Sequence, residues 1–266
     1  MVDFVIVEGP DDPRLEQFRL NERGLASRAD RRDDGGAGLF LAEGDLVVER
    51  ALAAGCRPAA ALADRDRLPP VATEIAAGGA DVFVGGEDVR RLITKLGMPQ
   101  PIVALFHRPR RPSVRDLITR SRRLVIVEGV DNPVNIGSIV RNAAALGWDG
   151  LILDHTSADP LSRRSLRVAM GTAFSLPHAR TTDLIGELDA MTGTGVEIYG
   201  LTPDPGAVDI RAVRPTGRRA LLIGAERSGL SAAALAMTAP VRIPMAAGVD
   251  SLNAASATAI ACYALD

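Results

Sequence analysis

The chain has 266 residues, of which 47% are apolar and 24% charged, and its formal net charge is −2. This length suits one large or two ordinary domains, and the composition is that of a globular protein. No apolar run is long enough to span a bilayer, so we expect no membrane partner. The two cysteines and three histidines are too scattered for a zinc site, and we expect no metal.

The N-terminus has neither the basic start nor the small-residue cleavage site of a signal peptide. We therefore expect a cytoplasmic protein in which Cys56 and Cys262 are reduced and buried. The basic residues are almost all arginines, since Lys95 is the only lysine. Arginine suits phosphate recognition, but the codon bias of a GC-rich genome would give the same enrichment, and both explanations stay open.

In the first half of the chain, short apolar runs alternate with segments of helical periodicity. Strands are expected at 39–42, 59–63, 81–84 and 102–106, and helices at 12–30, 44–55, 71–77 and 87–96. This alternation predicts a small α/β domain over residues 1–110. The run HRPRRPSVRDL then resembles a linker, in which Ser113 is a candidate N-cap.

The second half, residues 120–266, has the same alternation and predicts a mostly parallel sheet. Strands are expected at 124–128, 150–153, 176–179, 196–201, 219–223 and 241–243, with helices between them and at the end, over 253–263. A helix in DNPVNIGSIVRNAAALG is expected to bury Ile136, Ile139, Val140, Ala143 and Gly147. Asn135, Ser138 and Arg141 lie off that apolar stripe.

Three loops follow apolar strands and carry glycine beside polar residues: 131–137, 224–229 and 246–253. Ligands of open parallel sheets bind beyond the carboxyl ends of the strands, so we expect these loops to form one site. The last loop leads into a helix, whose N-terminus offers unpaired amides and a positive dipole end. A simpler reading is that Ser251 or Asn253 only caps this helix.

Several common sites are excluded by sequence. No G-x-G-x-x-G follows a strand, no Walker A motif is possible around the single lysine, and no G-x-S-x-G is present. A nucleotide-dependent oxidoreductase on an ordinary doubly wound sheet is therefore remote.

The three loops also carry a family resemblance. DNPVNIGSIVRNAAALG, LLIGAERSGL and IPMAAGVDSLNAASATAIA resemble, in order and spacing, the three motifs of the SpoU (TrmH-like) RNA ribose 2′-O-methyltransferases of the SPOUT superfamily. RVAMGTAFSLP is similar to the segment between the first two motifs, although the family usually has a serine where Ala169 stands. The run LFLAEGDLVVERALAAG more loosely resembles the substrate-binding domain of the family, which is built like a small ribosomal protein.

The resemblance implies an α/β fold with a C-terminal trefoil-knotted domain, a smaller N-terminal ribosomal-protein-like domain, and a homodimer that packs around the knot. It also implies S-adenosylmethionine (SAM) as the cofactor and RNA as the methyl acceptor. The cofactor residues that it implies are Leu201, Ile223, Gly224, Ala225, Glu226, Gly229, Ile243, Met245, Ser251, Leu252 and Asn253. Gly224, Gly229 and Gly248 would permit positive φ and close backbone approach.

The catalytic set implied by the resemblance is Arg141, Asn135, Glu226, Ser251 and Asn253. Because a guanidinium stays charged, we expect Arg141 mainly to hold a phosphate and favour the developing alkoxide, while a role in proton removal stays open. Glu226 would orient Arg141 or bind substrate. The simpler readings are a surface salt bridge for Arg141, an N-cap for Asn135 and a solvated loop acid for Glu226.

The candidate RNA contacts are Arg28, Arg31, Arg32, Arg110, Arg111 and Arg167. Only 3% of residues are aromatic, so base stacking is expected to be minor. With an added N-terminal domain, we expect ribosomal RNA rather than tRNA. The alternative function is a non-catalytic RNA-binding protein that retains the knotted fold.

Overall fold

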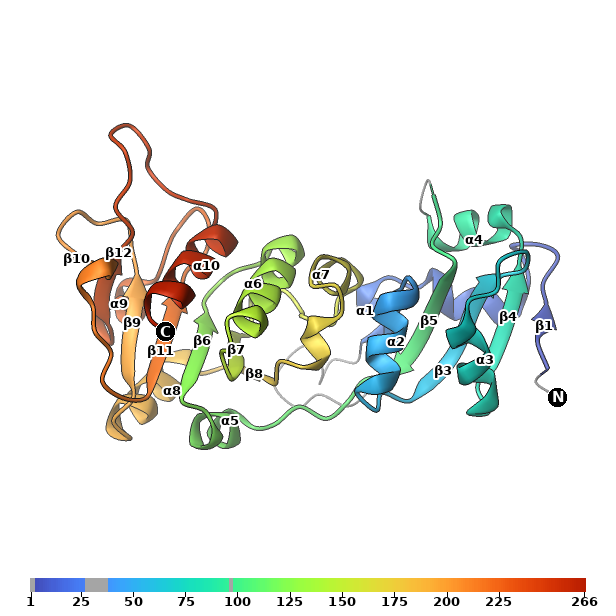
Figure 1. Ribbon diagram of the computed structural model, residues 1–266, viewed down its shortest axis with the longest axis horizontal. Helices are drawn as coiled ribbons and strands as arrows, with labels where there is room; N and C mark the ends of the chain where they lie inside the picture. The colour runs from blue at the N-terminus through green and yellow to red at the C-terminus, as the bar shows by residue number, and fades with distance from the viewer. Residues whose placement is uncertain (1–2, 27–37, 96–97) are drawn as a thin grey trace.

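The structure is a computed structural model that describes residues 3–26, 38–95 and 98–266. Its elements form two β-sheets at opposite ends of an elongated molecule, with helices between them (Figure 1). The described residues contain no helix long and apolar enough to cross a bilayer.

The first sheet is mixed. Its strands are β1 (Val5–Ile6), β2 (Leu39–Glu43), β3 (Pro58–Asp64), β4 (Asp81–Gly85) and β5 (Ile102–His107). They lie in the order β1-β4-β3-β5-β2. Strand β4 pairs in parallel with β1 and β3, whereas β5 pairs antiparallel with β3 and β2. The accompanying helices are η1 (Pro13–Arg19), α1 (Glu22–Leu25), α2 (Asp45–Ala53), α3 (Pro70–Ala77) and α4 (Glu87–Thr94).

One helix was predicted over 12–30, and this is wrong. Two short helices form instead, because Leu20 is extended and ends η1, and the side chain of Asn21 then caps α1 by accepting from Gly24 N. The arginines at 28, 31 and 32 lie outside the described residues.

The second sheet is parallel at every strand pair, as predicted. Its strands are β6 (Arg123–Val127), β7 (Gly150–Asp154), β8 (His178–Thr181), β9 (Glu197–Leu201), β10 (Val208–Asp209), β11 (Arg219–Ile223) and β12 (Ala239–Arg242). The strand expected at 176–179 begins two residues later. The helices are α5 (Val114–Arg120), α6 (Pro133–Ala145), α7 (Arg163–Val168), η2 (Thr172–Phe174), α8 (Leu184–Gly193), η3 (Ile210–Ala212), α9 (Ala232–Ala236) and α10 (Ala254–Ala264).

The strand order is β10-β12-β9-β11-β6-β7-β8. Since β12, β9, β11 and β6 are consecutive and parallel, their carboxyl ends meet at one edge of the sheet. The loops after these strands, including the three loops singled out from the sequence, therefore begin side by side.

Helix α6 buries Ile136, Ile139, Val140 and Ala143 as the periodicity predicts. Gly147 is not part of this stripe: it is exposed, lies beyond the end of the helix, and has a φ of +70°. Asn135 was placed off the buried face, but it is only 4% exposed.

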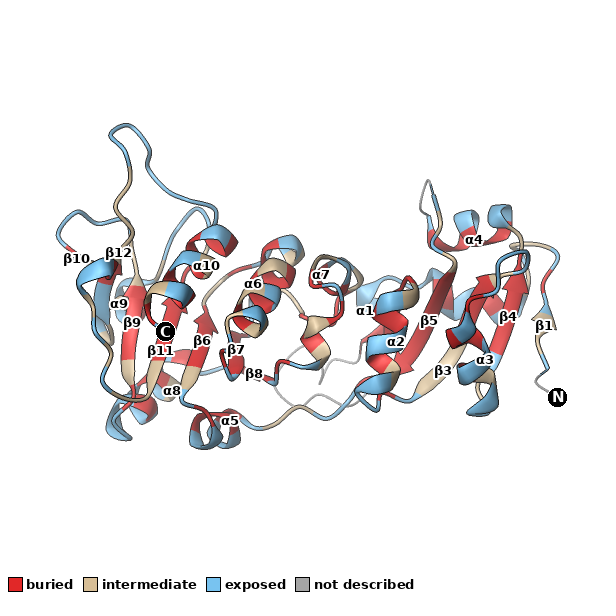
Figure 2. Ribbon diagram, viewed as in Figure 1, coloured by how far each residue is buried: buried red, intermediate tan, exposed pale blue. Residues whose placement is uncertain are grey.

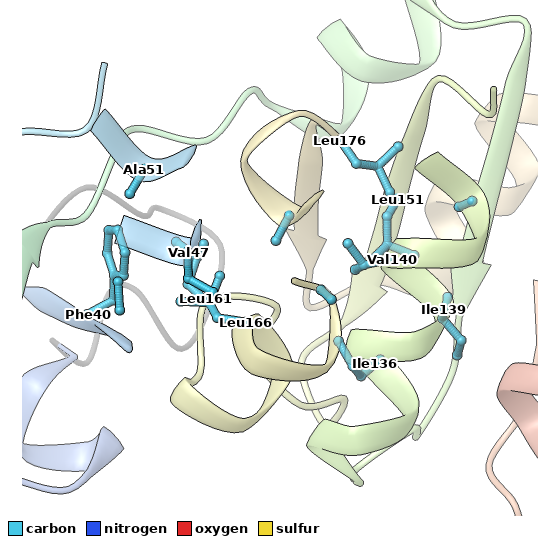
Figure 3. Close-up of a cluster of buried hydrophobic side chains, with 14 of the residues drawn as sticks. Phe40, Val47, Ala51, Ile136, Ile139, Val140, Leu151, Leu161, Leu166 and Leu176 are labelled. Carbon is cyan, nitrogen blue, oxygen red and sulfur yellow. The ribbon is translucent and has the colours of Figure 1, made fainter. Parts of the chain in front are cut away.

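One apolar core runs from the first sheet to the second (Figures 2 and 3). In Figure 3, Phe40, Val47 and Ala51 lie on one side of this junction, opposite Leu161 and Leu166. An ion pair accompanies the apolar contacts, since Arg163 Nε lies 2.9 Å from Glu43 Oε2. The sheets fall on either side of the predicted domain boundary, but this shared core holds them together.

Candidate functional site

A cavity of about 460 Å³ lies at the carboxyl ends of β9, β11 and β12. Of the eleven predicted cofactor residues, it is lined by ten, all but Asn253. From β9, β11 and the following loop come Leu201, Ile223, Gly224, Ala225, Glu226 and Gly229. From the segment after β12 come Ile243, Met245, Ser251 and Leu252.

Further lining residues are Thr202 and Pro203, which the sequence reasoning missed, and Arg227, Ser228 and Asp250, which belong to the two predicted loops. Thr202 and Pro203 directly follow β9, and the rest are neighbours of predicted residues. Reading each loop in full from the carboxyl end of its strand would have found them.

The lining combines apolar walls with a few charged and hydroxyl groups. Ile223 and Ile243 supply apolar surface, whereas Glu226, Asp250 and Ser251 supply polar atoms. Small-molecule sites commonly have this composition, in which apolar surface holds a ligand and few polar groups orient it. The arrangement suits a ligand with a flat apolar ring and a charged end.

Gly224 allows the loop after β11 to fold onto itself. A Cβ at this position would lie 2.2 Å from the carbonyl carbon of Gly229 and 2.3 Å from Leu230 N. The loop is closed by the Gly229 N–H, which donates to Ala225 O at 2.9 Å. Of the three glycines predicted to permit positive φ, Gly229 (+65°) and Gly248 (+83°) adopt it, and Gly224 is required for close approach instead.

Asn253 joins all three loop regions. Its Oδ1 accepts from Ala255 N at 3.0 Å and so caps α10. Its Nδ2 donates to Asn135 Oδ1 and to Glu226 Oε1, each at 2.9 Å. The N-cap reading of Asn253 is thus correct, and the same side chain also links α6 to the loop after β11. This bond explains why a polar residue at 135 is buried.

Glu128 directly follows β6 at the same edge of the sheet, and it also holds the site together. The sequence analysis did not identify this residue. Its carboxylate accepts from Ser231 N at 2.8 Å and from Ser231 Oγ at 2.7 Å. The loop after β11 is therefore fixed where α9 begins. An acidic residue directly after an apolar strand was the available signal.

The structure does not bring Arg141 to the cavity of its own chain. It is exposed on α6, and no described residue forms a hydrogen bond or ion pair with its guanidinium. Glu226 contacts Asn253 instead of orienting Arg141. The surface salt-bridge reading has no support either, and the guanidinium is available to an external group.

The predicted RNA contacts differ in environment. Arg110 and Arg167 are exposed. Arg111 is half-buried and acts on His178, whose pKa is lowered to about 4 by burial and then by the Arg111 charge. Arg111 is thus part of the interior of the protein, whereas Arg110 and Arg167 face solvent.

The matches to known proteins agree with this geometry. The model of the SpoU rRNA Methylase family matches residues 122–263, just over half of the chain. A tRNA/rRNA methyltransferase of Mycobacterium bovis is 40% identical over 98% of this chain and 91% of its own length. The 23S rRNA (guanosine(2553)-2′-O)-methyltransferase RlmP of Bacillus subtilis is 30% identical over 85% of this chain and 88% of its own length.

Solved structures are similar over nearly the whole chain. An AdoMet-bound rRNA methyltransferase from Sinorhizobium meliloti superposes with a TM-score of 0.81 at 28% identity, covering 97% of each chain. The SpoU methyltransferase AviRb from Streptomyces viridochromogenes, in complex with AdoMet, has a TM-score of 0.77 at 28% identity, covering 95% of this chain and 97% of its own. From the family match and these relatives, the chain belongs to the SpoU rRNA methylase family.

Proposed function

We propose that this protein is a SAM-dependent methyltransferase that methylates a ribose 2′-hydroxyl in RNA. One observation carries the proposal: two of the three loops, 224–229 and 246–253, line a single cavity, and Asn253 links Glu226 of the first to Asn135 on α6. The family membership and the AdoMet-bound structures of similar proteins support it. A binding module that only held RNA would need no such cavity.

The residues present fit SAM. Leu201, Ile223, Ile243 and Leu252 line the cavity and would flank the adenine, and backbone groups of the close turn at Gly224 would bind its polar atoms. When bound, SAM supplies an electrophilic methyl group on a sulfonium. A cavity of about 460 Å³ lies within the range of about 300–1,000 Å³ that is usual for small-molecule sites.

The residues of this chain then have to align the ribose hydroxyl with the methyl group and stabilise the negative charge that develops on the hydroxyl oxygen. Asn253 holds Glu226 and Asn135 in place, so the rim of the cavity is rigid before RNA binds. Arg141 would grip the phosphate beside the target ribose and stabilise the forming alkoxide. Removal of the hydroxyl proton through Arg141 or through that phosphate is the alternative role.

A homodimer is part of the proposal. Ile260 and Tyr263 of α10 are 43% and 76% exposed, and Val249 before it is 49% exposed, so an apolar surface lies open in the single chain. A second copy of the chain packed against α10 would remove this apolar surface from water. Because Arg141 lies outside its own cavity, the Arg141 of one protomer would serve the cavity of the other.

The proposal also includes a trefoil knot in the C-terminal domain, with the segment before α10 as the threaded part, and a ribosomal-protein-like domain over residues 1–110. These rest on the motif resemblance and on the similar SPOUT structures. We expect rRNA rather than tRNA as the acceptor, because two relatives named for a specific nucleotide, from Bacillus subtilis and Streptomyces viridochromogenes, are 23S rRNA methyltransferases. Work on rRNA would place the protein in the cytoplasm.

Calorimetric titration with SAM and S-adenosylhomocysteine tests the cofactor site. Saturable binding to the unaltered protein, lost in Gly224→Ala, is expected. Methylation of 23S rRNA and tRNA, with the 2′-O-methyl groups mapped by alkaline cleavage, then tests the acceptor. Binding of RNA without SAM binding or methyl transfer would instead support the non-catalytic alternative.

A further inference from the structure

A second cavity, of about 490 Å³, lies between the two halves of the molecule. One wall is formed by η1, α1 and the end of α4, and the other by α7. The cavity also reaches Pro133, the first residue of α6. We call it the interdomain groove, and none of the residues of the cofactor cavity lines it.

The groove is strongly basic. Among the described residues, its lining includes one carboxylate, that of Glu22, and five cations: Arg19, Lys95, Arg163, Arg164 and Arg167. Such an excess of one sign on facing walls of a groove concentrates anions there. A groove of this volume is larger than a single phosphate group requires.

The cations divide into two kinds. Arg163 is engaged within the protein, since its Nε pairs with Glu43 and its Nη1 donates to Thr94 O at 2.8 Å. Arg19 is engaged too, since its guanidinium donates to Pro10 O and lies 4.0 Å from Asp11 Oδ1. The side chains of Lys95, Arg164 and Arg167 are exposed, and no described residue forms a hydrogen bond or ion pair with their charged groups. Arg163 thus fixes α7 against the first half, and its neighbours remain available to an external anion.

The groove lies beside the first motif because α7 packs closely on α6. A Cβ on Gly137 would lie 2.5 Å from Ser165 O, and Ser165 Oγ donates to Pro133 O at 2.9 Å. Pro133 precedes Asn135 by two residues, or about 3 Å along a helix axis. The basic helix is therefore held at the end of α6 that carries Asn135.

We propose that the interdomain groove binds the backbone phosphates of the RNA strand next to the nucleotide that is methylated. This rests on the proposed function, and it assigns to that function a contact site. Recognition here is of the backbone, because the aromatic ring in the groove, Phe18, is only 3% exposed and offers no stacking face. Arginine forks on α7 match phosphate oxygens.

The test compares two double variants with equal charge change. Arg164→Ala with Arg167→Ala removes two cations of the groove. Arg57→Ala with Arg67→Ala removes two exposed arginines outside it. Binding of deproteinised bacterial 23S rRNA is measured by filter retention from 50 to 300 mM KCl, with SAM affinity measured on the same preparations.

We expect the groove variant to bind RNA at least about tenfold more weakly, since two charge-assisted contacts are lost. Its slope of log affinity against log salt should fall by about 0.7 per lost contact on single-stranded RNA. SAM affinity should be unchanged in both variants, and the control variant should bind RNA as the unaltered protein does.

Equal RNA affinity and equal salt slope in the groove variant and the control would overturn the groove assignment while leaving the methyltransferase proposal standing. An unaltered protein that binds SAM but no RNA would also overturn it. A third outcome is that the protein does not bind SAM, while its RNA binding is weakened in the groove variant only. This would overturn the proposed activity and support the assignment of the groove as a phosphate-binding site.

Discussion

Asn253 Nδ2 lies 2.9 Å from Asn135 Oδ1, which joins two helix N-termini whose residues are 118 positions apart in the chain. Asn253 is the N-cap of α10, and Asn135 lies in the first turn of α6. The side-chain amide of Asn253 thus caps α10 through its oxygen and bonds Asn135 and Glu226 through its nitrogen. The two roles can be separated by substitution.

Asn253→Asp keeps the capping oxygens but removes the donor to Asn135 and faces the Glu226 carboxylate. We expect methyl transfer to fall sharply, while the cap of α10 is retained. Asn253→Ala should in addition lose about 1 kcal/mol of unfolding free energy, because the cap is lost. Urea unfolding and methyl transfer to rRNA measure the two effects. Equal activity of the aspartate variant and the unaltered protein would refute the bridging role.

Arg141→Ala should abolish methyl transfer while SAM still binds, because Arg141 lies outside the cavity and no described residue pairs with it. Arg141→Lys should recover little activity, since a lysine cannot form the bidentate fork. Calorimetry with SAM and transfer of labelled methyl groups measure the two properties. Full activity of the alanine variant would exclude the proposed role.

Mixed dimers test whether Arg141 acts across the interface of the proposed homodimer. Co-expression of the Arg141→Ala chain with the Asn253→Asp chain gives dimers in which one cavity has both an intact rim and an Arg141 from the other chain. Activity should reappear at about half the unaltered level per mixed dimer. If each cavity uses its own Arg141, the mixture stays inactive.

The buried ring of His178 should make stability depend on pH. Burial, together with the Arg111 charge, lowers its pKa to about 4, so the folded protein holds it neutral while the unfolded chain binds a proton below about 6.5. Stability should therefore fall as the pH drops from 6.5 to 4, by up to about 3 kcal/mol. His178→Asn should flatten this slope in urea unfolding series, whereas the control His155→Asn, at an exposed position, should leave it unchanged.

The Glu43–Arg163 pair should stabilise the contact between the two halves. The Glu43 side chain is 1% exposed and that of Arg163 27% exposed, so removing one charge leaves the other poorly solvated. Glu43→Ala should cost about 3 kcal/mol. The control is Asp88→Ala, which breaks an exposed pair with Arg91 and should cost below about 1 kcal/mol. Equal urea midpoints for the two variants would contradict this.

Much of the fold followed from local patterns. The apolar runs predicted the parallel second sheet, and Ser113 and Asn253 were identified as helix caps. The loops of the cavity could be predicted because parallel strands end at a common edge, and motif resemblance then supplied the individual residues. Local rules failed over 12–30, where an extended Leu20 interrupts the helical pattern.

By itself, then, the sequence determined the elements, the loops that carry chemistry and the family. Only the tertiary structure decided that Asn135 is buried against Asn253, that Glu128 holds Ser231, that Arg141 stays outside its own cavity, and that α7 faces α4 across a basic groove. The physical reason is that periodicity and capping act over a few residues. Contacts between segments a hundred positions apart depend on strand order and on how closely α6 and α7 can pack.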